Sequence, residues 1–279
     1  PGVLGGVVDR DTGQPMPADN ESLILAMNGG QPMAPRLMYE FPRAAMHLEN
    51  KKGRSFIERF LTQTYGGDNW TPAPLHRWLA GLNLPYVIDC NRDTQLQRCY
   101  ADRPHTLVVG AARIAASPYR FDIYRFDAGR YQRIDQSEVN PALPVLFKPL
   151  GTPLPSPSYV ASDADFVDYI TELMGGFAIP GWLKLQRKEC RYLFLGMQFN
   201  RDTERMLMSD LIHDAAAPAG WAPTHAEVAD QLAQSGAPMN AATRSRAPSN
   251  SSVASAPSRC TAGMCCSPRA PGIWWTPWM

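Results

Sequence analysis

Short continuous apolar runs alternate along this chain with longer stretches in which apolar residues recur at helical spacing. Apolar runs occur at residues 86–88, 106–109, 145–147 and 192–195, and residues 121–126 and 129–134 have the pattern of a hairpin. Strands that alternate with helices favour a mostly parallel sheet with helices on both faces. Because runs of this length suit strands that are buried in such a sheet, the sequence predicts an α/β domain.

The helical stretches carry start signals that set their approximate bounds. Asp19 or Asn20 can cap the first helix, and Pro42 is expected to kink or end the second. Ser162 can cap the sixth, with Asp165 three residues later as a weak capping-box partner. We expect helices at residues 20–26, 36–49, 55–64, 75–82, 93–100, 162–174 and 202–212.

Charge and hydropathy argue against several classes of partner. A net charge of +1 gives no electrostatic reason to expect nucleic acid or an anionic membrane surface as a partner. The chain has no run of about 18 apolar residues that could span a bilayer. Its opening, PGVLGGVVDR, lacks the pattern of a signal peptide and begins without Met. We therefore expect a cytoplasmic protein without nucleic-acid or membrane partners, whose first strand is truncated.

The six cysteines do not have the spacing of a metal site. None of them forms a CxxC pair, which a structural zinc site usually supplies. We therefore expect no metal and interpret the cysteines as buried or incidental thiols of a reducing compartment. The cysteines are Cys90, Cys99, Cys190, Cys260, Cys265 and Cys266.

The composition changes abruptly towards the C-terminus. No acidic residue follows Asp230, and the final GIWWTPWM has three tryptophans without a helical or strand period. Two interpretations stay open: a disordered linker, or translation out of frame from about Trp221. Under either, we expect residues 1–214 to form the domain and residues 215–279 to lie outside the fold.

Ligands of parallel sheets bind beyond the carboxyl ends of the strands, so the segments at those positions are the candidates for a binding site. DCNRD at 89–93 and FKPLGT at 147–152 end two of the predicted strands, and LFLGMQ at 193–198 precedes the last helix. GGVVD at 5–9, with Gly13 and Pro15 downstream, has the composition of a first turn.

Taken in this order and spacing, these segments resemble the SIR2-like family, as a divergent bacterial member. There the pattern reads GAGxS…GxP, TTNYD, K-x-HG-S/T and LFxGYS, and the resemblance covers roughly residues 2–214. It implies a Rossmann-like NAD(+)-binding domain with a small inserted helical lobe, which the helices between residues 20 and 64 would form. Family enzymes cleave the bond between nicotinamide and ribose.

The resemblance also implies roles for individual residues. Asn91 and Asp93 match the family's catalytic asparagine and aspartate. The implied cofactor contacts are Gly5, Gly6, Gly13, Pro15, Asn91, Gly151, Thr152, Gly196, Met197 and Gln198.

The sequence departs from the family pattern at functional positions. Leu150 stands where the family has its catalytic histidine, and an alkyl side chain cannot accept a proton. Val7 replaces a first-turn glycine, and its Cβ would crowd a pyrophosphate. Met197 and Gln198 replace the usual Tyr/Thr and Ser, and the zinc ribbon of the sirtuin deacylases is missing. We therefore expect weak or lost NAD(+) hydrolysis and no zinc-dependent deacylation.

Simpler roles remain open for the same residues. Asn91 could satisfy backbone groups in a turn, and Asp93 could cap a helix. Gly196 could serve only a tight turn, and Lys148 could be a solvated charge. Four histidines are candidates for a displaced base or for packing and helix-end roles: His47, His76, His105 and His213. At the level of function, the alternatives are a non-catalytic interaction module, with a protein partner or self-association, and an NADase with a nonstandard base.

Overall fold

The computed structural model describes residues 3–114, 117–188, 190, 192–197, 199, 202–211 and 272–275. Seven strands form its central sheet: β3 (Tyr86–Asp89), β4 (His105–Gly110), β5 (Phe121–Asp127), β6 (Arg130–Arg133), β7 (Val145–Lys148), β10 (Tyr192–Leu195) and β11 (Gly272–Trp275). Their order is β10-β11-β3-β7-β4-β5-β6. Neighbours from β10 to β4 are parallel, whereas β5 and β6 extend one edge in antiparallel pairings. The predicted α/β class with a largely parallel sheet is confirmed.

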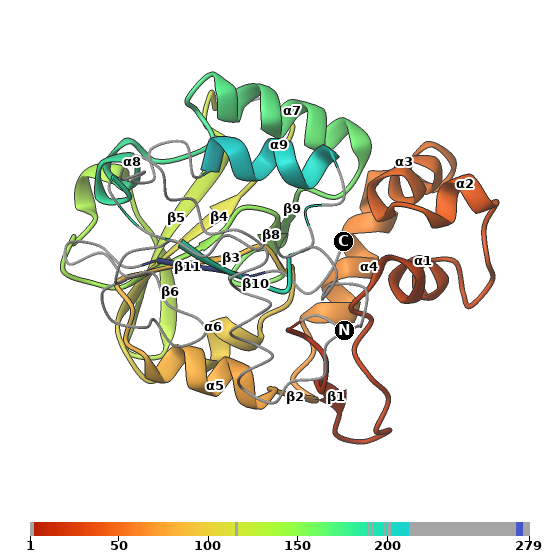
Figure 1. Ribbon diagram of the computed structural model, residues 1–279, viewed down its shortest axis with the longest axis horizontal. Helices are drawn as coiled ribbons and strands as arrows, with labels where there is room; N and C mark the ends of the chain where they lie inside the picture. Colours follow the sequence, from red (N-terminus) through yellow and green to blue (C-terminus); the bar gives the residue numbers. More distant parts are fainter. Residues whose placement is uncertain are drawn as a thin grey trace, which may run out of the picture.

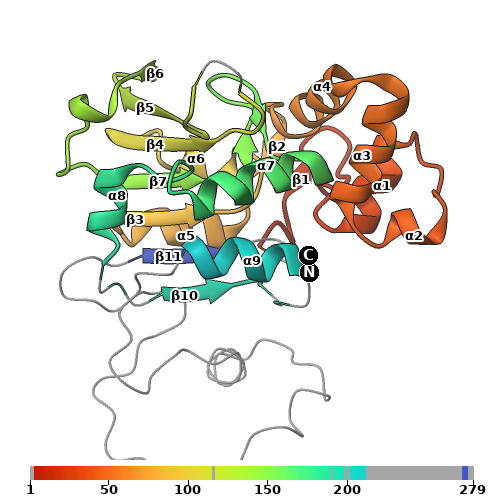
Figure 2. The ribbon, with the colours of Figure 1, turned by 90° about the horizontal axis from the view of Figure 1, so that it is seen from above.

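Helices cover both faces of this sheet (Figures 1 and 2). They are α5 (Pro74–Gly81), α6 (Gln95–Cys99), α7 (Asp163–Met174), α8 (Gly181–Gln186) and α9 (Asp202–Leu211), with a 3-10 turn at Gln136–Glu138. Successive strand residues face opposite sides. Ile88 and Phe147 pack in one core with α7, α8 and α9, whereas Val87 and Leu146 pack in another with α5 and α6.

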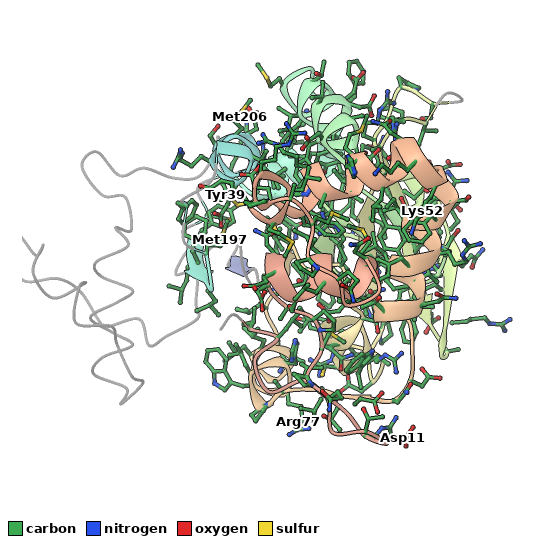
Figure 3. The ribbon with its side chains drawn as sticks, turned by 90° about the vertical axis from the view of Figure 1, so that its right-hand side faces the viewer. Asp11, Tyr39, Lys52, Arg77, Met197 and Met206 are labelled. Carbon is green, nitrogen blue, oxygen red and sulfur yellow. The ribbon has the colours of Figure 1, made fainter. Side chains whose placement is uncertain are left out.

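A lobe of four helices lies beside the sheet (Figure 1). It consists of α1 (Asn20–Met27), α2 (Pro35–Met38), α3 (Phe41–Lys52) and α4 (Arg54–Tyr65), and it has a hydrophobic core of its own. Figure 3 views the molecule from the lobe side, where Lys52 marks the end of α3. Its helices lie within the residue range expected for a helical lobe, and they precede every strand of the large sheet in the chain.

The predicted start signals of the helices are confirmed. Asp19 caps α1, since its Oδ1 accepts the N–H of Ser22 at 2.8 Å. Asp165 accepts the N–H of Ser162 at 3.0 Å in the capping box of α7. Pro42 lies in the first turn of α3, so it marks the boundary between two helices.

Charged side chains fasten the lobe to the sheet domain. Oδ1 of the buried Asp165 accepts Nη1 of Arg54 from α4 at 2.5 Å and Nε of Arg113 at 2.6 Å. Arg113 also donates to Glu49 of α3 at 2.5 Å. One carboxylate at the start of α7 therefore links the lobe to the loop after β4.

Two small antiparallel sheets complete the described part. β1 (Val8–Asp9) pairs with β2 (Trp70–Thr71), and β8 (Gly151–Thr152) pairs with β9 (Ser158–Tyr159). Gly151 has φ +88°, and a Cβ there would lie 2.0 Å from the carbonyl oxygen of Ser158. The β8–β9 pairing thus requires glycine at this position.

The expectation that everything after residue 214 lies outside the fold is wrong for four residues. Gly272–Trp275 form β11, an interior strand between β10 and β3. A strand inside a covered sheet needs no alternation of apolar and polar residues, so the absence of a period did not argue against it. The rest of that segment, residues 215–271 and 276–279, lies outside the described residues. Among the helices of the described part, none is long and apolar enough to cross a membrane.

Candidate functional site

The carboxyl end of β3 faces the helical lobe. Just beyond this strand, the guanidinium of Arg92 lies over the ring of Phe41 in α3, 5.3 Å from its centroid. Arg92 Nε and Nη2 donate to the carbonyl of Val160 at 3.1 and 2.6 Å, and burial lowers its pKa to about 10. Thr94 Oγ1 donates to the carbonyl of Tyr65, the last residue of α4, at 3.3 Å. The segment after β3 is therefore held between sheet and lobe.

A buried ion pair joins the ends of β3 and β7. Lys148 Nζ donates to Asp89 Oδ2 at 2.6 Å, and both side chains are fully buried. Burial raises the pKa of the Asp89 carboxyl above its usual value, and the Lys148 ammonium opposes part of that rise. Lys148 is therefore not the solvated charge that the simpler interpretation suggested.

The Asn91 side chain lies at the centre of the candidate site. The residue is 2% exposed, and neither Nδ2 nor Oδ1 has a hydrogen-bond partner among the described residues. Its backbone N–H donates to Asp89 Oδ1 at 2.9 Å, so it is Asp89 that stabilises the turn. The simpler interpretation of Asn91 as a turn-stabilising side chain does not hold. An unmatched buried polar group costs about 1–3 kcal/mol, so it needs an explanation.

Asp93 and Gln95 extend this set of unmatched polar atoms. Asp93 Oδ1 accepts the N–H of Gln95, the first residue of α6, at 2.7 Å, whereas the N-cap of α6 is Thr94, one residue later than expected. Asp93 Oδ2 and both side-chain polar atoms of Gln95 have no partner in the described part of the chain, although both residues are fully buried. Gln95 was not expected in the site; its only sequence signal is its position two residues after Asp93.

The segment after β7 packs against the hydrophobic core and forms one hydrogen bond to α6. Leu150 is buried in the hydrophobic core with Cys90 and Val160, which leaves an alkyl surface at the family's histidine position. Thr152 Oγ1 donates to Gln97 Oε1 at 2.5 Å and thereby joins β8 to α6. Thr152 is therefore engaged within the protein.

The segment after β10 lies farther along the same edge of the sheet. Gly196 has φ +75° and ends the strand in a turn that favours glycine. Met197 is buried in the core, and Gln198 lies outside the described residues. Leu195 pairs with Trp275, which pairs with Asp89, so Asn91 and Gly196 follow strands separated by β11 alone. Two strand spacings amount to about 10 Å.

The first-turn residues belong to a different part of the structure. Gly5, Gly6, Gly13 and Pro15 are exposed and flank β1, which pairs with β2 and forms an isolated bridge with Pro15. The structure therefore does not bring them to the end of a strand of the large sheet. Val7 is fully buried in the core of the lobe, so its side chain serves packing.

Two of the candidate histidines are buried. His105 lies among aromatic rings, with Nε2 3.0 Å from the Tyr131 hydroxyl and Nδ1 3.1 Å from the carbonyl of Arg103. This confirms its packing role. His76 in α5 is also buried; burial lowers its pKa, and the nearby carboxylate of Asp93 opposes that shift. His47 is half-buried in the lobe, and His213 lies outside the described residues.

The donor set of the candidate site consists of amides and one carboxylate oxygen. No group of three or more His, Cys, Asp or Glu residues in the described part could hold a metal. The unmatched atoms of Asn91, Asp93 and Gln95 offer two amides and one carboxylate oxygen, which suit hydroxyl and amide groups. A comparison with models of known protein families and with curated protein sequences finds no match.

Proposed function

We propose that this protein is a divergent SIR2-like domain that binds NAD(+) or a related nucleotide at the carboxyl end of β3. In this proposal the sheet and lobe form a Rossmann-like unit of the sirtuin type, and NAD-glycohydrolase activity is weak or lost. The single observation that carries it is the buried Asn91 amide without a partner among the described residues. This residue occupies the position of the family's catalytic asparagine.

The chemistry around Asn91 suits the ribose of a nucleotide better than its phosphates. The two amides and the free carboxylate oxygen can each bind ribose hydroxyls. The nearest cations are already engaged: Lys148 binds Asp89, and Arg92 donates to the carbonyl of Val160. The first-turn glycines flank β1 of another sheet, so in the described part of the chain they supply no backbone cradle for pyrophosphate beside the site. We therefore expect weak nucleotide binding that depends on the ribose contacts.

Thermal unfolding with NAD(+) or ADP-ribose tests the proposal. A ligand that binds only the native state adds about 2.7 kcal/mol of stability at 100 times its Kd. We expect stabilisation of the unmodified chain by both ligands and its loss in Asn91→Ala. Asn50→Ala, at an exposed position of α3, is the matched control and should keep the stabilisation. Equal stabilisation of both variants would place the ligand elsewhere.

A non-catalytic interaction module is the second candidate. The observation in its favour is that Thr152 and Met197, both implied cofactor contacts, are engaged or buried within the protein. Such a module would act through a protein partner or self-association. Absence of any stabilisation by NAD(+) or ADP-ribose at millimolar concentration would favour it. For either candidate we propose a cytoplasmic location, which Cys90 and Cys99 support, because neither forms a disulfide in the described part of the chain.

A further inference from the structure

Strand β11 is an interior strand that comes from a remote part of the chain. It pairs in parallel with β10 on one side and β3 on the other, so that Ile273 lies opposite both Leu193 and Val87. Its residue range is separated from α9, the preceding described element, by residues 212–271. Figure 2 shows β11 between β3 and β10.

The rest of the sheet does not need β11 for its own connections. The ladder from β3 through β7, β4 and β5 to β6 is continuous, and β10 is joined to it by α7 and α8. Without β11, both Tyr86–Asp89 and Tyr192–Leu195 would present an unpaired edge towards a gap one strand wide. Unpaired edges of this kind recruit an added strand.

The chemistry of the gap defines the strand that it accepts. The flanking segments are YVID and YLFL, and the inserted segment is GIWW, which has no charge. Residues 212–271 separate β11 from α9 in the sequence, and a separation of this length does not restrict β11 to the sheet of its own chain. The same segment from another copy meets identical pairing edges.

We propose that the gap between β3 and β10 accepts the Gly272–Trp275 segment of a second copy of this chain, so that exchange of β11 joins two molecules. In an isolated chain, the chain's own segment fills the gap, as the structure shows. Exchange of an identical element keeps every backbone hydrogen bond of the ladder, so that it costs little enthalpy and depends on protein concentration.

Mixing experiments with the full chain test this exchange. Two batches, one isotopically heavy, are mixed at high concentration, warmed to just below the melting temperature, cooled and examined by native mass spectrometry. We expect dimers that contain one light and one heavy chain from the unmodified protein. Ile273→Val, which preserves the strand, should give the same result. Ile273→Pro, which removes a ladder hydrogen bond, should lower the mixed dimer at least tenfold.

A second measurement distinguishes loss of strand exchange from misfolding of the Ile273→Pro variant. A site-specific protease sequence placed between residues 240 and 250 allows the unmodified protein to be cut after it has folded. A labelled peptide of residues 268–279 should then exchange into the cut protein, whereas the peptide with Ile273→Pro should not. Absence of mixed dimers from the unmodified chain overturns the proposal, even where the peptide exchanges. Mixed dimers that are equally abundant with Ile273→Pro overturn it too, since they form without β11.

Discussion

Asn91 combines full burial with an amide that forms no hydrogen bond in the described structure. A bound ligand that accepts hydrogen bonds from or donates them to the amide would offset the cost of its desolvation. Substitution of Asn91 by an apolar residue should therefore raise the stability of the ligand-free protein and weaken ligand binding. Asn91→Leu replaces the amide with an apolar group of similar size. We expect the free energy of unfolding without ligand to rise by about 1 kcal/mol, while stabilisation by ADP-ribose disappears. Chemical denaturation with and without ADP-ribose measures both effects, and a clear loss of stability would show that the amide has a partner after all.

In the proposed site, Leu150 stands where cleavage of a nucleotide would need a base. A positioned base contributes about 10²–10⁴-fold, and this buried alkyl side chain supplies none. We expect no appreciable release of nicotinamide from NAD(+) by the unmodified protein, as measured by chromatography. Leu150→His tests whether the remaining pocket is competent: activity that appears with this change and disappears when Asn91→Ala is added would show a site that lacks one part.

Robust release of nicotinamide by the unmodified chain would contradict that expectation. The base would then be a histidine to which we assign no catalytic role. His76 is the first to replace, because its pKa responds to the carboxylate of Asp93. His105→Ala is the comparison, because His105 bonds to Tyr131 on the antiparallel side of the sheet.

At the scale of elements, one carboxylate connects the lobe to α7. Asp165 is buried and binds both Arg54 and Arg113, whereas its neighbour on the same helix, Asp163, makes a 4.0 Å exposed pair with Arg43. We expect Asp165→Asn to lower the free energy of unfolding by about 2 kcal/mol, because charge-assisted hydrogen bonds are each worth about 1.5–3 kcal/mol. Asp163→Asn should change it by less than about 0.5 kcal/mol. Equal effects in denaturant titrations would contradict the anchoring role.

Local chemistry explains why most elements could be predicted. Asp19 starts α1 by accepting the backbone N–H of Ser22, and Asp165 starts α7 by accepting the backbone N–H of Ser162, so the signal and its effect lie within four residues. α8 was missed because it is short and buries a single residue, Leu183. β11 was missed because its stability comes from pairing with two distant strands, which no local pattern records.

The site could be predicted only where it depends on strand ends. Asn91 and Asp93 were placed correctly beyond β3, because a buried apolar run identifies the strand and hence its carboxyl end. The position of Gly5 and Gly6 could not be predicted, since it depends on the pairing of β1 with β2 across more than 60 residues. That Lys148 is buried also required the tertiary structure, because its partner Asp89 lies on another strand.

For the whole molecule, buried histidines make stability depend on pH. Burial lowers the pKa of His105 and of His76, so the folded protein favours the neutral imidazoles, whereas the unfolded chain takes up protons near pH 6.5. This contribution to stability is present above about pH 6.5 and is lost as the pH falls below it. We expect a lower free energy of unfolding at about pH 5.5 than at about pH 7.5. His105→Phe should reduce the difference, and an unchanged difference in this variant would exclude the contribution of His105.

The position of β11 in the chain has a consequence for synthesis. A ribosome releases β3 and β10 long before Gly272–Trp275, although the final sheet places that segment between them. A growing chain can thus assemble the ladder from β3 to β6 early, but two strand edges stay open until the last described element emerges. We expect the nascent protein to be exposed to aggregation and to chaperones for at least as long as residues 212–271 take to be translated.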